Sequence, residues 1–148
     1  MENMNYYEPG IELPEEKEEQ PVAEATKKPR FYTPWEVGDT EYKLKLTSGA
    51  ITTLEGKFKD SLLNVVLDNG VPTVSIVLTI LQAALQKFHH GIKTEAVGDL
   101  YDQYIDDGHT QMDLLSDVLL PLMGDAGFFT AKQLQMMQEE MKTIDQEL

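Results

Sequence analysis

The fold is decided by an apolar stretch that reads TVSIVLTILQAALQKFHH (Thr73–His90). Thr73 follows a proline and is a good helix N-cap, and the residues after it leave almost no polar face before Gln82. A helix that is apolar nearly all round is usually buried at the centre of a protein. We therefore expect this helix to be the hub of a core on which the rest of the chain packs.

Helix signals follow one another on both sides of this stretch. The spacing of apolar and capping residues predicts helices over 47–59, 61–67 and 94–107, and a further helix from Thr110 onward. Pro121 lies inside this last helix and should kink it or end its regular part, because proline removes a hydrogen-bond donor and clashes with the preceding turn. The pattern therefore indicates a mainly α protein with a compact multi-helix domain.

A terminal amphipathic helix is predicted over residues 130–148. Thr130 and Gln133 have the spacing of a capping box. The apolar residues that follow are separated by alternating steps of three and four, which is typical of a helix that lies in one groove or against one partner helix. They are Leu134, Met137, Met141, Ile144 and Leu148.

The N-terminal part of the chain has a different composition. Residues 1–30 hold eight acidic and four basic residues, several prolines and few apolar side chains. Burial cannot offset the entropy cost of ordering such a segment, so we expect a disordered acidic N-terminal tail. The alternative is a short linear binding motif formed by Tyr6-Tyr7 and Ile11. Residues 31–148 then form a single helical domain. It has at most one short N-terminal strand, where Tyr42–Leu46 alternates with period two.

The composition also limits the molecules that the protein is expected to bind and the compartment in which it is expected to act. The formal net charge is -14, and this field repels a phosphate backbone, so we expect no direct binding to nucleic acid. There is no cysteine, which excludes disulfides and thiolate chemistry. No apolar run reaches about 18 residues and the first residues lack the features of a secretory signal, so we expect no membrane segment and a cytoplasmic protein.

The motifs of metal sites and of enzymes are missing. The positions around Gly70, Gly108 and Gly127 lack the oxygen ligands of a calcium-binding loop. His89 and His90 are adjacent, so they point away from each other and make a poor metal pair. There is no phosphate-binding loop, nucleophile elbow or zinc-protease helix. We therefore expect an interaction protein that is not an enzyme and that uses no metal and no cofactor.

A succession of five segments carries a resemblance to a known family. Their order and spacing across about residues 40–129 resemble those of the tail assembly chaperones of long-tailed (siphovirus-like) bacteriophages and prophages. Each segment alone is a common helix pattern, and the specificity lies in the succession. The segments are LKLTSGAITTLE (Leu44–Glu55), SLL (Ser61–Leu63), LQAAL (Leu81–Leu85), LYDQYIDDG (Leu100–Gly108) and the stretch from Leu120 to Phe129.

The resemblance implies a role in virion assembly. Proteins of this family are small, mostly helical and non-enzymatic, act in the host bacterial cytoplasm and are absent from the mature virion. They bind the long tape-measure protein, keep it soluble and help the tail-tube protein to polymerise around it. This sequence suits such partners, because an exposed apolar helix needs an apolar groove and a strongly charged exterior keeps the complex soluble.

The candidate partner-binding residues are the stripe of the terminal helix and the aromatic pair before it. Internal packing is the alternative for this stripe, since two and a half heptads do not decide between the two. An exposed stripe would also favour weak self-association. The candidates are Phe128, Phe129, Leu134, Met137, Met141 and Ile144.

A second interpretation is an acidic regulatory or decoy protein that mimics nucleic acid in the basic groove of a DNA-binding protein. Such a mimic presents carboxylates at regular spacing on a rigid surface. The residues that could do so are Asp99, Asp102, Asp106, Asp113 and Asp117.

Overall fold

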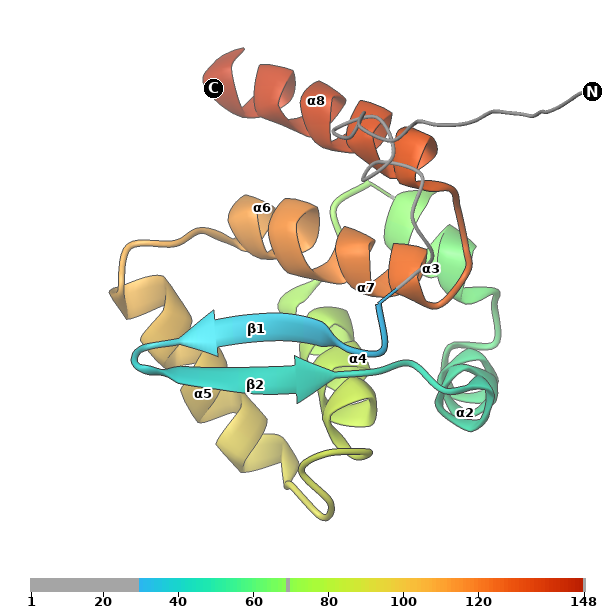
Figure 1. Ribbon diagram of the computed structural model, residues 1–148, viewed down its shortest axis with the longest axis vertical. Helices are drawn as coiled ribbons and strands as arrows, with labels where there is room; N and C mark the ends of the chain where they lie inside the picture. Colours follow the sequence, from blue (N-terminus) through green and yellow to red (C-terminus); the bar gives the residue numbers. More distant parts are fainter. Residues whose placement is uncertain (1–29, 69, 148) are drawn as a thin grey trace, which may run out of the picture.

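The computed structural model describes residues 30–68 and 70–147 of the chain (Figure 1). The predicted disordered tail falls, apart from Arg30, on residues that lie outside this part.

The described chain is mainly helical, as the sequence predicts, and helices begin at the caps expected at Thr47, Thr73 and Thr110, whereas the helix over 62–67 is capped by Ser61, which the prediction placed inside that helix. The side chains of Thr47, Ser61, Thr73 and Thr110 each accept a hydrogen bond from the backbone N–H three residues on. The elements are β1 (Thr33–Val37), β2 (Thr40–Leu44), α2 (Ser48–Phe58), α3 (Leu62–Leu67), α4 (Val74–Leu85), α5 (Thr94–Asp106), α6 (Gln111–Leu114), the π-helical segment η4 (Leu115–Leu119), α7 (Leu120–Asp125) and α8 (Ala131–Glu147).

A two-stranded antiparallel hairpin replaces the single strand at most that the sequence predicts. β1 pairs with β2 so that Trp35 lies opposite Tyr42. Gly38, at a φ of 62°, and Asp39 form the short connection, and glycine suits the first position of such a turn. The prediction was wrong for the first strand because Pro34 argues against a strand in sequence, yet proline is tolerated on an edge strand such as this one.

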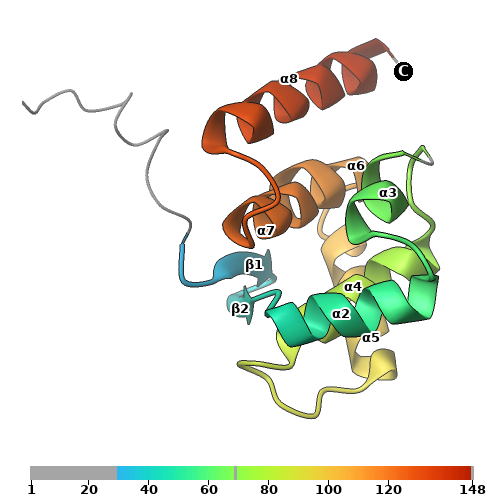
Figure 2. The same ribbon diagram turned by 90° about the vertical axis from the view of Figure 1, so that its right-hand side faces the viewer.

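The segments α6, η4 and α7 follow one path through the middle of the molecule, and we call residues 111–125 the central helix. The hairpin packs on one side of it, where β1 contacts η4 and α7. On the other side α8 lies along η4 and α7 (Figures 1 and 2). The central helix is therefore covered from two opposite sides by segments from the two ends of the domain.

The central helix is buried more completely than the predicted hub. Every residue from Leu114 to Met123 except Asp117 is buried. In contrast, α4 buries one face and leaves Val74 exposed and Ile76 half-buried. The expectation of a hub at α4 thus holds only in part, because the apolar residues all round the central helix need cover on every side. The buried residues of α4 are Val77, Ile80, Leu81, Ala84 and Leu85.

Pro121 changes the helix that contains it, as its chemistry requires. The backbone N–H of Leu120 donates to the carbonyl of Leu115, one residue further back than in an α-helix, so the helix widens into a π-turn directly before the proline. Residue 121 itself offers no N–H. The carbonyl of Ser116 therefore loses both of the backbone donors that a helix could supply.

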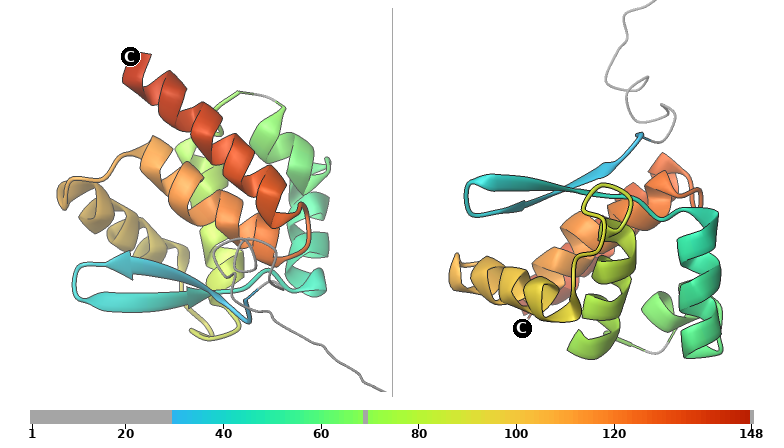
Figure 3. Two further views of the ribbon diagram at one scale, coloured as in Figure 1. Left: turned by 45° about the horizontal axis from the view of Figure 1, so that its top comes forward. Right: turned by 90° about the horizontal axis from the view of Figure 1, so that it is seen from below.

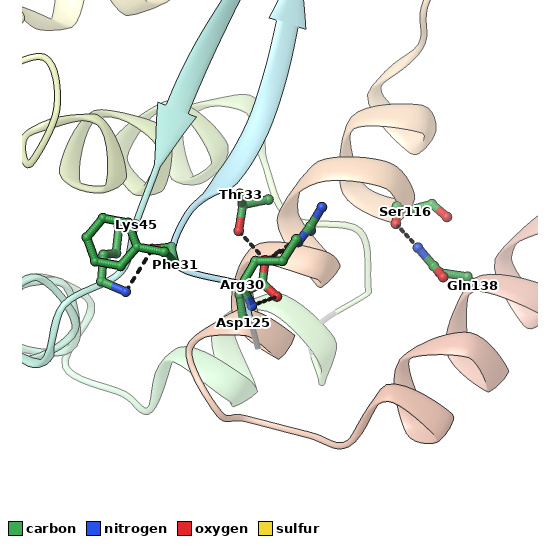
Figure 4. A network of polar contacts seen from close by, with 7 residues as sticks. All are labelled: Arg30, Phe31, Thr33, Lys45, Ser116, Asp125 and Gln138. Atoms are coloured by element: carbon green, nitrogen blue, oxygen red, sulfur yellow. Dashed lines mark hydrogen bonds and ion pairs between the residues drawn. The ribbon is translucent and has the colours of Figure 1, made fainter. Parts of the chain in front are cut away.

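The start of β1 is fastened to the end of the central helix. The carboxylate of Asp125 accepts hydrogen bonds from the Thr33 hydroxyl at 2.6 Å and from the Arg30 backbone N–H at 3.3 Å. It also forms an ion pair with the Arg30 guanidinium at 2.9 Å (Figure 4). The cation offsets the unfavourable position of a carboxylate at a helix C-terminus.

A tyrosine at the end of α5 is buried beneath the hairpin. Tyr104 is 4% exposed, packs against Trp35 with a centroid distance of 6.0 Å and stacks on His109 at 4.2 Å. Burial raises the pKa of Tyr104 from 10.0 to about 12, and the carboxylates of Asp113 and Asp117 add to the shift. The folded protein thus holds this phenol in its neutral form.

The stability of the core can be tested by two substitutions in neighbouring turns of the central helix. Leu119→Ala should cost about 2–5 kcal/mol of unfolding free energy, because it opens a cavity at a fully buried position. Ser116→Ala should change it by less than about 1 kcal/mol or stabilise the protein, since the buried Ser116 hydroxyl has no hydrogen-bond partner in the described part of the chain. Urea unfolding measures both, and equal losses would contradict this account of the core.

The raised pKa of Tyr104 predicts a loss of stability at alkaline pH. The unfolded chain releases this proton near the ordinary pKa, whereas the folded chain holds it up to about pH 12. The contribution is therefore present below about pH 10 and is lost as the pH rises toward 12. Urea unfolding across this range should show a shallower decline for Tyr104→Phe than for the wild type, and parallel curves would refute the assignment.

Candidate functional site

An open groove of about 640 Å³ lies between α3 and α8, and we call it the apolar groove. It is the place where large apolar side chains gather at the surface, since Leu63, Leu67 and Met136 are 37%, 38% and 58% exposed. Such clustering on a protein surface marks an interaction site. The lining residues are Leu63, Leu67, Phe128, Phe129, Gln133, Met136, Met137, Glu139, Glu140 and Thr143.

Local contacts orient the α3 wall of the groove. The hydroxyl of Ser61 caps the helix at Asn64, and the carboxylate of Glu55 on α2 accepts a hydrogen bond from the Leu62 N–H at 2.8 Å. Leu62 therefore points into the core. Leu63 and Leu67, four residues apart, then share the opposite, outward face.

The α8 wall is set by a cap at its start and by one bond in its middle. The Thr130 hydroxyl accepts from the Gln133 N–H at 3.1 Å, and the Gln133 side chain accepts from the Thr130 N–H at 2.9 Å. Further along, Nε2 of Gln138 donates to the Ser116 carbonyl at 2.8 Å (Figure 4). This is the carbonyl that Pro121 and the π-turn leave without a helical donor, so α8 supplies what the central helix lacks.

The candidate residues from the sequence separate into two groups. Phe128, Phe129 and Met137 line the apolar groove. Leu134 and Met141 do not line it, and they are half-buried and pack against the core, as Met137 and the two phenylalanines also do. The described part of the predicted stripe therefore faces the interior, and Met137 also borders the groove.

Ile144 lies on α8 by its backbone. Its side chain lies outside the described part of the structure. A role for it in binding stays a prediction.

Sequence reasoning missed Leu63, Leu67 and Met136. A signal was present for the first two, because the short helix LLNVVL carries apolar residues on more faces than one side of a core can cover. Met136 stands one residue before a stripe position, where a pattern search expects a solvated side chain. Its place in the groove depends on α3, which is distant in sequence.

The rim of the groove is acidic. Glu139 and Glu140 are exposed lining residues on α8, and no lysine or arginine lines the groove among the described residues. An apolar floor beside carboxylates suits an amphipathic helix whose apolar stripe is flanked by basic residues. The groove therefore favours a helical protein partner.

One histidine of the pair singled out in sequence, His89, is engaged in holding the fold. Nε2 of His89 accepts a hydrogen bond from the Lys43 backbone N–H at 3.1 Å, and its ring packs against Tyr42 at 5.3 Å. Within the described residues no three histidine or acidic side chains gather as metal ligands would. In the same part of the chain, no helix is both long and apolar enough to cross a membrane.

Fold and groove together define a small, mainly helical protein with an open apolar groove on its surface. The chain belongs to a family of unknown function, DUF6096, whose pattern matches residues 27–148. No curated protein and no solved structure matches the chain.

The bond between Gln138 and the Ser116 carbonyl can be tested by a double-mutant cycle. Gln138→Ala should cost about 1–3 kcal/mol of unfolding free energy, because it leaves a carbonyl of a buried residue without a donor. In a Pro121→Ala background the cost should shrink, since residue 121 regains an N–H for that carbonyl. Gln135→Ala, on the exposed side of the same helix, is the matched control and should change stability by less than about 0.5 kcal/mol. Equal costs in both backgrounds would count against this pairing.

Proposed function

We propose that this protein is a tail assembly chaperone of long-tailed bacteriophages and prophages. In this proposal it acts in the host bacterial cytoplasm, is not an enzyme and is absent from the mature virion. It binds the tape-measure protein in the apolar groove and assists the polymerisation of the tail-tube protein. The observation that carries the proposal is the exposure of Leu63, Leu67 and Met136 together in one groove.

The physics of the groove supports this role. A tape-measure protein is a long helical chain, and before assembly its apolar surface has nothing to cover it. A groove between two helices can receive one apolar helical stripe, with anchors at intervals of three and four residues. Methionine suits such a task because its flexible, polarizable side chain packs against irregular sequence. The charge of the whole chain, -14, keeps the complex soluble.

The same groove supports the expectation of weak self-association. Without its partner, one copy can offer apolar residues to the groove of another. The net charge opposes this approach, and salt screens the repulsion.

The alternative of an acidic decoy protein has weaker support. Asp99, Asp102 and Asp106 are exposed on α5, as a mimic of nucleic acid requires. Asp113, however, accepts a hydrogen bond from the Thr110 N–H at 2.9 Å and so serves as a helix cap. The apolar groove also has no task in this alternative.

Co-expression tests the proposal. The wild type should raise the soluble yield of the tape-measure protein of the same phage or prophage and should purify with it. The double substitution Leu63→Asp with Met136→Asp should abolish both effects, because carboxylates in the groove repel an apolar stripe. Both positions are exposed, so the double variant should keep the circular dichroism spectrum and melting temperature of the wild type.

A matched control comes from a third exposed apolar residue. Val74 is 39% exposed at the start of α4 and does not line the groove. Val74→Asp should therefore rescue the tape-measure protein as well as the wild type does. If the wild type neither binds nor solubilises the tape-measure protein, the chaperone proposal is wrong. If a folded groove double variant still rescues, the contact site lies elsewhere.

A further inference from the structure

A second groove, of about 950 Å³, is lined by residues of α2, α4 and the loop between α4 and α5. Figure 3 shows how α2 and α4 are arranged. Four lysines line it, while Glu95 is the one carboxylate among its lining residues. This concentration of positive charge stands out in a chain whose net charge is -14. We call this surface the lysine groove, and its lysines are Lys45, Lys57, Lys87 and Lys93.

The wall that carries two of these lysines is held in place by hydrogen bonds. The side-chain amides of Gln82 and Gln86 both donate to the Ile92 carbonyl, at 3.3 and 3.2 Å. The Gly91 N–H donates to Oε1 of Gln86 at 3.1 Å, and the Thr94 hydroxyl donates to Oε1 of Gln82 at 3.1 Å. The loop between α4 and α5 is thereby fixed, and Lys87 and Lys93 stand at its two ends.

The charge of the groove is not neutralised by the residues around it. In the described ranges 30–68 and 70–147, none of its four lysines forms an ion pair with a carboxylate. Lys45 donates instead to the Phe31 carbonyl at 3.0 Å and lies over the Phe31 ring at 5.0 Å (Figure 4). The groove therefore offers charge for an acidic ligand.

The chain enters the domain at the edge of this groove. Phe31 contacts Phe88 with a centroid distance of 5.8 Å, and Phe88 directly follows Lys87. Phe31 thus lies against Lys45, one lysine of the groove, and against the residue that follows Lys87. Whatever precedes Arg30 is tethered at this point.

We propose that the lysine groove binds an extended acidic peptide segment and that its occupant is the chain's own stretch ELPEEKEE (Glu12–Glu19). Five of these eight residues are glutamates. The ten residues between Glu19 and Arg30 reach roughly 35 Å when extended, which is enough to cross a small domain. Tethering also gives the segment an effective concentration on the order of millimolar, so weak contacts suffice for occupancy.

The chemistry of the contact sets how it should behave. Salt screens the attraction between the carboxylates of the segment and the lysines of the groove. The fraction of molecules in which the segment occupies the groove should therefore fall as ionic strength rises. Ala83 and Ile92 line the same groove and are half-buried, so they offer an apolar place for Leu13. The proposal does not depend on the chaperone function, because the two grooves share no lining residue.

Zero-length carbodiimide cross-linking of the full chain at low salt tests this proposal. The reagent joins a lysine amine to a carboxylate only when the two are in direct contact. Mass spectrometry should find Lys57, Lys87 or Lys93 linked to glutamates of the 12–19 segment in the monomer fraction. These links should disappear in 0.5 M salt.

Two variants of the full chain complete the experiment. Changing Glu15, Glu16, Glu18 and Glu19 to Gln should expose the groove, and a fluorescent synthetic peptide of residues 8–22 should then bind this variant and not the wild type. Changing Glu2, Glu8 and Glu24 to Gln removes charge outside the segment, and the wild-type cross-links should persist.

Three outcomes would overturn the proposal. The first is a set of links that falls on lysines outside the groove. The second is a yield that depends on protein concentration, which would place the tail of a second copy in the groove. The third is that an acidic segment of another protein binds the lysine groove of the wild type while the cross-links of residues 12–19 persist, which would mean that residues 12–19 do not occupy the groove.

Discussion

One hydrogen bond joins α8 to the central helix, and it exists because of a proline. Pro121 cannot donate, and the π-turn before it diverts the Leu120 N–H to Leu115, so the Ser116 carbonyl is left for Gln138 to satisfy. In an uninterrupted α-helix, a backbone N–H of the same helix would have donated to this carbonyl. Such a helix would have contacted α8 only through apolar side chains. Here the stripe and the bond act together, and they fix how α8 lies along the central helix. The walls of the apolar groove follow from this placement.

The same central helix explains why a hairpin is present in a helical protein. A helix with apolar residues all round must be covered on every side. The hairpin covers one side with Trp35 and Val37, both of which are buried. Asp125 holds the first strand in place through Arg30 and Thr33. The hairpin is thus part of the core, and its short length is sufficient because it packs on four helical segments, α4, α5, η4 and α7.

The sequence predicts those structural features that depend on residues close to one another in the chain. Helix starts at Thr47, Thr73 and Thr110 lie where it places them, because a cap and its N–H are neighbours in the chain, while the cap of α3 falls on Ser61, one residue after the predicted Asp60. The π-turn and the groove could not be predicted, since each depends on groups that are distant in sequence. Met136 is the clearest case, because it is part of the apolar groove only through the presence of α3 beside it. Leu134, Met137 and Met141 of the predicted stripe pack inward for the same reason, because the core residues behind α8 are distant in sequence.

The apolar groove has a mechanical consequence. Its walls are each held from behind, α3 by α2 and α8 by η4 and α7 (Figure 2). The Gln138 bond and the packing of Leu134 and Met141 hold α8 on the central helix, so the backbone of the groove forms a fixed aperture. Adjustment to a thicker or thinner occupant then falls to the flexible side chains of Met136 and Met137, which line the groove. In the proposed chaperone role, such a groove tolerates variety along one long ligand, because its methionine side chains adapt to stretches whose side chains differ in size.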